Sequence, residues 1–416
     1  MILFSRRRRA GRVGRTGGAV LGLVVSIALV GCTGGVPGAP GGAILANPAR
    51  ADPSRTPVAP PPSPAADPLP VVLPRDDGPH DRLTEWWYYT GHLKAEDGGR
   101  YGFEYVIFRA ERGRFPTSWV SHLAITDEGG DRFLYGQRLE VGDQVDRSPR
   151  SSDGEPTGFD LALSGADPTR PETFAVPAWS MRGSEGRDHL VAQFAPEEAA
   201  EAGAPAGLGL ELELVADKPA AMHDRDGWID FGPAGGSYYY SRTAMTASGS
   251  LTVDGRTMAV DGAAWFDHQW GDFISVGGGG WDWFAVNLDD GTDITLSLVR
   301  EADGTYPLVY GTVVDPDGHV RHLDRDDFSV DVSDRWTSPS TGADYPAGWI
   351  VRIPGEDLEI TLQPTVAAQE LDTRATTGVV YWEGSQEVRA ARDGRAMGGE
   401  GYVELTGYAP IVSPVE

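Results

Sequence analysis

The sequence has 416 residues, of which 40% are hydrophobic, so it can bury one or two cores and is neither a short peptide nor a disordered chain. Its formal net charge is −26, although the first 31 residues hold six arginines and no acidic residue. The rest of the chain is therefore strongly acidic and repels phosphate backbones. We expect no binding of nucleic acid.

Residues 1–31 have the pattern of an export signal. The six arginines precede an apolar run from Ala19 to Val30, which is too short to span a bilayer but has the length of a signal-peptide core. The residues before Cys32, Leu-Val-Gly, resemble a bacterial lipobox, and Cys32 is the only cysteine. We expect lipidation of Cys32 and a membrane-anchored protein on the extracytoplasmic side of a bacterial cell envelope. The alternative is an ordinary signal peptide with an incidental cysteine.

Residues 32–80 are rich in proline, alanine and glycine. This composition cannot bury a core and favours extended chain, so the sequence predicts a linker, with folding beginning near Asp81. Because only one cysteine is present, no disulfide within the chain is possible. The folded part must be stabilised by its core alone.

From Asp81 to Glu416 the sequence consists of short alternating segments rich in Tyr, Trp, Phe, Val and Thr, separated by Asp-Gly and Gly-Gly turns. This pattern predicts an all-β protein with two barrels or sandwiches. Only residues 196–207 have a briefly helical composition, and we expect them to form a surface loop. A similar hairpin pattern around Trp87 and around Trp283 supports two halves, which we place at residues 81–255 and 256–416.

Two predicted strands end an apolar row with an arginine. Tyr101, Phe103, Tyr105, Ile107 and Arg109 share one face of the first strand, and Thr292, Ile294, Leu296, Leu298 and Arg300 share one face of the second. Each arginine either closes its barrel through a salt bridge or contacts a ligand at the barrel mouth.

Asp282 is a candidate proton donor. It has the same parity as Phe284, Val286 and Leu288, whereas Trp283 faces the other way. A carboxyl group in apolar surroundings has a raised pKa and is suited to general-acid chemistry. The alternative is a structural aspartate paired with Arg300.

The segment around His268 places different residues on its two faces. Phe266, His268 and Trp270 share one face, and Asp267 lies on the other with Trp265 and Gln269. A histidine beside tryptophan can hold a proton or position water, although an ordinary core histidine has the same pattern. Adjacent strand residues point in opposite directions, so Asp267 and His268 do not bind a metal together. No other metal or cofactor motif is present, and we expect neither.

The remaining candidates are polar or aromatic residues on predicted strands. Glu85 shares a face with Trp87 and Tyr89, while Trp86, Tyr88 and His92 face the other way, so this strand is covered on both sides or lies between the halves. The candidate ligand-binding residues are Glu85, Trp87, Tyr89, Arg109, His122, Tyr239, Asp267, Trp283 and Arg300. His223, in a turn-rich segment, is expected to be solvated.

Six motifs in chain order resemble the AttH/CrtC family: EWWYYTGHL, YYYS, AWFDHQWGDF, WDWFAVNLDDG, YWEGS and GYVELTGYA. The resemblance implies two consecutive lipocalin-like antiparallel barrels. The family includes carotenoid 1,2-hydratases, in which a His-x-Trp pair and a Tyr-x-Asp pair are implicated in protonating an isoprenoid. His268-Gln269-Trp270 corresponds to the first pair. Trp281-Asp282 is the nearest feature to the second, but it departs from that pattern.

These features lead to one main hypothesis and two alternatives. The main hypothesis is a monomeric lipoprotein that binds an isoprenoid or acyl ligand and performs acid–base water chemistry, with Asp282 as proton donor, His268 holding a proton or water, and Trp270 stabilising a developing cation. The first alternative is a carrier of lipids or hydrophobic small molecules. The second is glycan binding, which requires Trp281 and Trp283 to face solvent.

Overall fold

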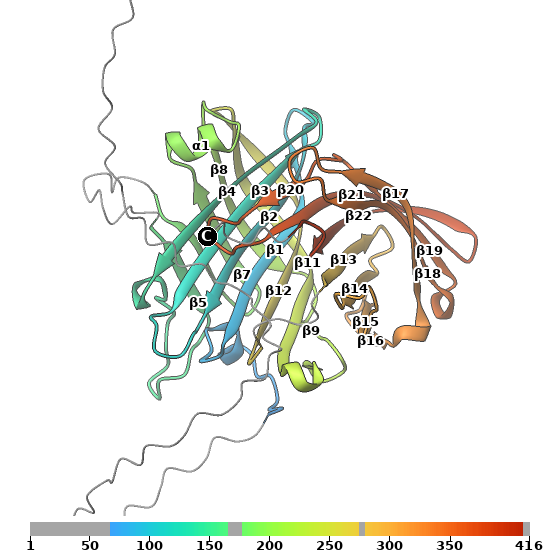
Figure 1. Cartoon of the computed structure of the whole chain (residues 1–416), viewed down its shortest axis with the longest axis horizontal. Coiled ribbons are helices and arrows are strands. Elements are labelled where there is room, and N and C mark those ends of the chain that lie inside the picture. The colour runs from blue at the N-terminus through green and yellow to red at the C-terminus, as the bar shows by residue number, and fades with distance from the viewer. Residues whose placement is uncertain (1–66, 165–176, 274–278, 411–416) are drawn as a thin grey trace, which may run out of the picture.

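The computed structural model describes residues 67–164, 177–273 and 279–410 (Figure 1). The expected signal peptide, Cys32 and most of the expected linker lie outside these residues. Strands make up most of the described chain, and they form two separate antiparallel sheets. Among the described residues, no helix has the length and apolar character needed to cross a membrane. The structure confirms the all-β fold with two barrel-like sheets.

The first sheet forms a nearly closed barrel. Its main path runs β4-β3-β2-β1-β12-β11-β8-β7-β6-β5, and two short strands, β9 and β10, pair with β11. The strands are β1 (Thr84–Ala95), β2 (Arg100–Ala110), β3 (Ser118–Asp127), β4 (Arg132–Val141), β5 (Phe159–Leu163), β6 (Trp179–Ser184), β7 (Arg187–Gln193), β8 (Leu208–Ala216), β9 (Ala221–Met222), β10 (Trp228–Asp230), β11 (Gly236–Val253) and β12 (Arg256–Gly271).

The second sheet is a half-barrel with open edges at β16 and β17. Its path runs β16-β15-β14-β13-β22-β21-β19-β18-β17, and β20 pairs with β21. The strands are β13 (Gly280–Leu288), β14 (Asp293–Arg300), β15 (Leu308–Val314), β16 (Val320–Leu323), β17 (Ser329–Thr337), β18 (Asp344–Ile353), β19 (Leu358–Pro364), β20 (Glu370–Asp372), β21 (Val380–Arg392) and β22 (Arg395–Thr406).

Helical elements are short and lie in the connections. The one described α-helix is α1 (Pro196–Glu201), which lies within the segment of helical composition that was expected to be a surface loop. The 3₁₀ turns are η1 (Arg75–Asp77), η2 (Asp143–Val145), η4 (Gly232–Ala234), η5 (Arg325–Asp327) and η6 (Pro354–Glu356).

Side chains fill the interior of the first barrel. Alternate residues of each strand point inward, and the buried cluster includes Trp87, Tyr89, Phe103, Trp119 and Trp179. The concave face of the second sheet holds a separate cluster around Phe284, Trp349 and Trp382. Each sheet therefore has its own core, as expected for two consecutive units.

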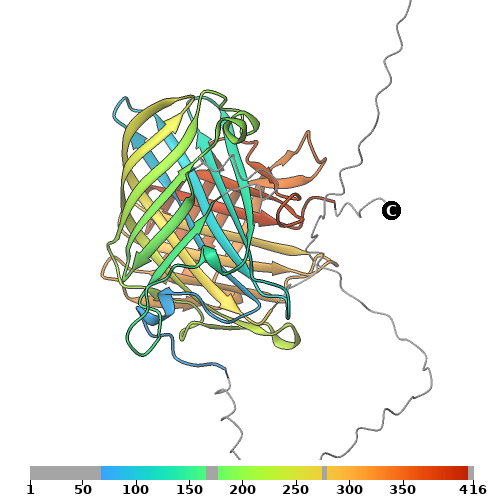
Figure 2. The same ribbon diagram turned by 90° about the vertical axis from the view of Figure 1, so that its left-hand side faces the viewer.

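The two sheets pack against each other through their other faces (Figure 2). Tyr88 of β1 and Trp265 of β12 point out of the first barrel and contact Trp283 and Ala285 of β13 and Tyr402 of β22. The β1 strand thus has one face in the barrel core and the other against the second sheet. This explains the aromatic residues on both of its faces.

The unit boundaries differ from those expected from the sequence. Strand β12 extends to Gly271 and pairs with both β1 and β11, so the first sheet continues well past residue 255. The packed region also begins before Asp81, since Asp77 is fully buried and its carbonyl accepts a hydrogen bond from Trp87 Nε1 at 3.0 Å. A proline-rich composition did not prevent this segment from packing against the barrel end.

Candidate functional site

A cavity of about 280 Å³ lies between the two sheets. Its walls are mostly apolar and come from the outward face of β1, β2, β3, β11 and β12 and from β13, β14, β15, β21 and β22. The lining includes Trp86, Tyr88, Phe108, Trp281, Trp283 and Tyr310 among aromatic residues, and His122, Tyr239, Asp267, Glu383 and Glu404 among polar ones. Apolar walls with a few convergent polar groups are typical of small-molecule sites.

The cavity opens at one end of the strands. Its lining includes Thr84, the first residue of β1, and Thr406, the last residue of β22. Trp281 and Val379, near this end, are 37% and 38% exposed, whereas Glu383 is fully buried. The mouth is therefore on the side where the N-terminal segment joins β1.

Three glutamates from both sheets meet in or behind the cavity wall. Glu404 of β22 lies opposite Trp283 on one neighbouring strand and Glu383 on the other. Burial raises the pKa of Glu404 to about 7, and the charge of Asp267 adds to this effect. Burial and mutual repulsion also raise the pKa values of Glu383 and Glu104 well above the usual range. The site therefore holds carboxyl groups that are protonated near neutral pH.

Glu404 is the member of this group that a ligand can reach. It lines the cavity and is half-buried, whereas Glu104 and Glu383 are fully buried. Glu383 accepts a hydrogen bond from the Tyr88 hydroxyl at 3.0 Å, and neither carboxylate oxygen of Glu104 has a hydrogen-bond partner. An unpartnered buried carboxyl group favours its neutral form.

Asp267 is a fixed acceptor on the opposite wall. It accepts hydrogen bonds from Tyr239 Oη at 2.5 Å, from Trp265 Nε1 at 2.6 Å and from Ser241 Oγ. Burial raises its pKa to about 6, although the three donors oppose this rise. Tyr239 also accepts a hydrogen bond from Trp283 Nε1 at 3.0 Å, so this network connects the two sheets.

His122, which was a weaker candidate from the sequence, lies in the wall of the cavity. Its Nδ1 is 2.6 Å from Tyr381 Oη and its Nε2 is 3.1 Å from Thr376 Oγ1, so it joins β3 to the second unit. Burial lowers its pKa to about 3. His122 is therefore neutral and serves as a hydrogen-bonding group.

Asp282 is not in the cavity, contrary to the proton-donor prediction. Its parity was predicted correctly, since it faces the concave core of the second sheet with Phe284. There it accepts hydrogen bonds from Arg300 Nη1 at 2.8 Å and Tyr408 Oη at 2.9 Å. The structural alternative, a pair with Arg300, describes this geometry, and a ligand-contacting role for Arg300 is not supported.

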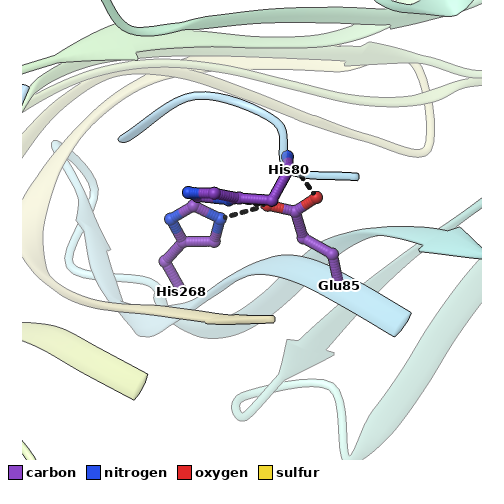
Figure 3. A group of neighbouring side chains, drawn as sticks. All are labelled: His80, Glu85 and His268. Carbon is purple, nitrogen blue, oxygen red and sulfur yellow. Dashed lines mark hydrogen bonds and ion pairs between the residues drawn. The ribbon is translucent and has the colours of Figure 1, made fainter. Parts of the chain in front are cut away.

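His268 and Trp270 also face away from the cavity, into the first barrel. There His268 Nε2 lies 2.9 Å from Glu85 Oε1, and Glu85 also contacts His80 (Figure 3). Trp87 and Tyr89 belong to the same core. The structure thus brings five predicted residues together, Glu85, Trp87, Tyr89, His268 and Trp270, but separates them from Asp282 and from the cavity.

Arg109 closes the end of the first barrel. Its guanidinium group donates to the backbone oxygen of His80 at 2.5 Å and to the carboxylate of Glu111. Of the two alternatives predicted for Arg109, the structure therefore shows the salt bridge.

Of the predicted ligand-binding residues, Arg109, His122, Tyr239, Asp267 and Trp283 are among the residues that line the cavity. Sequence reasoning missed Glu404 and Glu383, whose signal was an acidic residue on the same face of a strand as Tyr402 or Tyr381. His223 was expected to be solvated but is fully buried between Ser241 and Thr312, at 2.7 and 2.9 Å. The expectation failed because the short β9 strand pairs with β11 and places the adjacent His223 between the sheets.

Comparisons with known proteins agree with this architecture. Residues 64–408 match the AttH-like family. The chain belongs to this family. An AttH protein from Nitrosomonas europaea has 29% sequence identity to it, with a TM-score of 0.68 over 84% of this chain and 100% of that one. No curated protein sequence matches.

Two more distant structures share the fold of this AttH-like chain. Kievitone hydratase from Nectria haematococca is 15% identical, with a TM-score of 0.59 over 82% of this chain and 94% of its own. CghA in complex with Sch210972 is 14% identical, with a TM-score of 0.51 over 83% of this chain and 96% of its own. At these identities the likeness shows a shared fold.

Proposed function

We propose that the cavity between the two sheets binds a small apolar molecule of isoprenoid or acyl type and adds water to it, with Glu404 as the proton donor. The observation that carries this proposal is a carboxyl group with a pKa of about 7 on the wall of a mostly apolar cavity. A general acid works best when its pKa lies near the working pH. The name of the distant neighbour kievitone hydratase is consistent with this chemistry.

The chemistry requires only groups of the chain and one water molecule. Glu404 would transfer its proton to a carbon of a double bond, and the resulting cation would lie against aromatic faces such as Trp283 and Tyr88. Water would then add to the cation and return a proton to the Glu404 carboxylate. Asp267 would act as a positioning residue, because it holds Tyr239 and through it Trp283.

The cavity volume limits the ligand. At about 280 Å³ it lies near the lower end of the usual range for ligand sites, roughly 300–1,000 Å³. We therefore expect a short ligand or the end of a longer one. Glycan binding is disfavoured, because it requires a solvent-facing Trp283 and this side chain is only 5% exposed.

The test uses geraniol, a short isoprenoid alcohol, and oleic acid as probes. We expect binding by calorimetry and conversion of geraniol to a hydrated product detected by mass spectrometry. Glu404→Gln should keep binding and lose about 10²- to 10⁴-fold of the turnover rate. The control Glu387→Gln, in the adjacent strand β21 and away from the cavity, should keep both.

Two outcomes of this test would overturn the catalytic part. If the wild type binds either probe and converts none, the protein is a carrier. If Glu404→Gln converts geraniol at the wild-type rate, the proton comes from another group.

We also infer that the chain is exported and anchored through Cys32. The sequence pattern at residues 1–32 supports this inference. Metabolic labelling with palmitate should label the wild type, and Cys32→Ser should be unlabelled and absent from the membrane fraction. Unlabelled wild-type protein would leave an ordinary signal peptide as the explanation.

A further inference from the structure

We propose that His80, Glu85 and His268 bind a divalent transition-metal ion, preferentially Zn²⁺, at one end of the first barrel (Figure 3). The candidate ligand atoms are His80 Nδ1, Glu85 Oε1 and His268 Nε2, and all three lie within 4.8 Å of one another. Glu85 Oε1 is 2.7 Å from His80 Nδ1 and 2.9 Å from His268 Nε2. This site is distinct from the cavity of the proposed function.

The donor set suits zinc. Two imidazole nitrogens and one carboxylate oxygen are common protein ligands of Zn²⁺, with bonds of about 2.0–2.2 Å and a fourth position left for water. Ligand atoms around a tetrahedral ion at these bond lengths lie roughly 3.3 Å apart. The observed separations from Glu85 need to widen by only a few tenths of an ångström.

Aromatic rings fix the orientation of both histidines. The His80 ring stacks on Trp270 at 4.1 Å with an interplanar angle of 1°. The His268 ring lies between Trp87 and Trp270, each at 4.7 Å. The ligand atoms are therefore pre-oriented toward Glu85, which reduces the entropic cost of binding an ion.

The second ring nitrogen of each histidine faces an acceptor. His80 Nε2 is 3.5 Å from Asp76 Oδ1. His268 Nδ1 is 3.4 Å from Tyr240 Oη, whose own proton is donated to Asp77 at 2.5 Å. Both of these ring nitrogens must therefore carry hydrogen to make a favourable contact.

A bound metal ion allows the outer ring nitrogens of both histidines to carry the hydrogen that these contacts need. If His80 and His268 are neutral and donate to Glu85, their second nitrogens carry lone pairs toward Asp76 and Tyr240, which is unfavourable. If an ion occupies the inner lone pairs, the outer nitrogens carry the hydrogens and donate outward. Metal-binding histidines commonly donate their other N–H group to a carboxylate or another oxygen in this way.

The local charges also favour a cation. Asp76 pairs with Arg75, and Asp77 pairs with Arg242. Glu85 is fully buried, and its ion-pair partners in the described part of the chain are the two histidines, with no lysine or arginine. A bound divalent ion would place further positive charge beside this buried carboxylate.

The ion would join three separate segments. His80 belongs to the N-terminal segment, Glu85 to β1 and His268 to β12. A metal at this point would tie the segment before β1 to the barrel end.

The test uses the full-length chain, purified in detergent with a tag that contains no histidine and stripped with a chelator. We expect one Zn²⁺ per chain by calorimetry and elemental analysis, and a rise in Tm on the order of 5 °C at a hundredfold excess over Kd. His268→Gln and His80→Gln should each weaken Zn²⁺ binding at least 100-fold. Co²⁺ in place of Zn²⁺ should give the visible absorption of a tetrahedral site.

The control is His319→Gln, which changes a histidine in an exposed group with Asp315 and Asp317 and should leave Zn²⁺ binding unchanged. The proposal is overturned if the wild type binds no zinc and its Tm does not change when zinc is added. It is also overturned if zinc binds and His80→Gln binds it equally well. The wild-type Tm keeps the test decisive even if His268→Gln fails to fold.

Discussion

Replacing Glu404 with glutamine should stabilise the protein at alkaline pH and have little effect at acidic pH. Burial raises the pKa of this carboxyl group from 4.5 to about 7 in the folded state. Between these values the unfolded state loses its proton first, so the folded state loses stability as the pH rises from 4.5 through 7. At about 1.4 kcal/mol for each pH unit, the loss is about 3 kcal/mol above pH 7. Glutamine cannot ionise and removes this loss.

The assay is urea unfolding followed by tryptophan fluorescence between pH 4.5 and 8.5. The difference in unfolding free energy between Glu404→Gln and the wild type should grow from near zero at pH 4.5 to about 3 kcal/mol at pH 8. The control Glu387→Gln changes an exposed residue and should show no such growth. A difference that is constant with pH, or a wild type that gains stability relative to Glu404→Gln on raising the pH, would refute the argument.

Three further variants test the packing of the two units by the same unfolding assay. Asp282→Asn should lower the free energy of unfolding by about 3 kcal/mol, because it leaves the Arg300 side chain, which is 12% exposed, without its carboxylate partner. Adding Arg300→Met should recover part of this loss, and equal losses in the single and double variants would contradict the pairing. Trp382→Ala should lower the free energy of unfolding by about 3–5 kcal/mol, because the Trp382 side chain fills the second core beside Trp349. A loss below about 1 kcal/mol would mean that this core is loosely packed. Asp293→Asn should lower the free energy of unfolding by about 2–3 kcal/mol, because Lys218 and Thr243 of the first unit both donate hydrogen bonds to the Asp293 carboxylate. An unchanged urea midpoint would show that this contact between the units is unimportant for stability.

Strand parity predicted much of the fold from the sequence. Alternation correctly predicted the inward faces of the strands that end at Arg109 and Arg300. It also predicted that Asp267 and His268 point in opposite directions and that Asp282 has apolar surroundings. These features depend on residues next to one another in the chain. Alternation alone therefore determines them.

The candidate site could not be predicted because it depends on long-range pairing. Strand β22 pairs with β13 and β21 in a register that places Glu404 opposite both Trp283 and Glu383, which no local pattern specifies. The cavity lies between two sheets instead of inside one barrel, because aromatic side chains already fill the barrel interior. Glu404 becomes a site residue only when both walls are in place.

The open half-barrel leaves two strands, β16 and β17, without a neighbour on one side within the described sheet. Such edges can pair with another chain and start aggregation. The β16 edge is only four residues long, and the β17 edge has register shifts around Asp334 and exposes charged residues such as Asp331 and Arg335. Irregular backbone and exposed charges resist the addition of a further strand. An incomplete barrel can therefore remain in solution without polymerising along its edges.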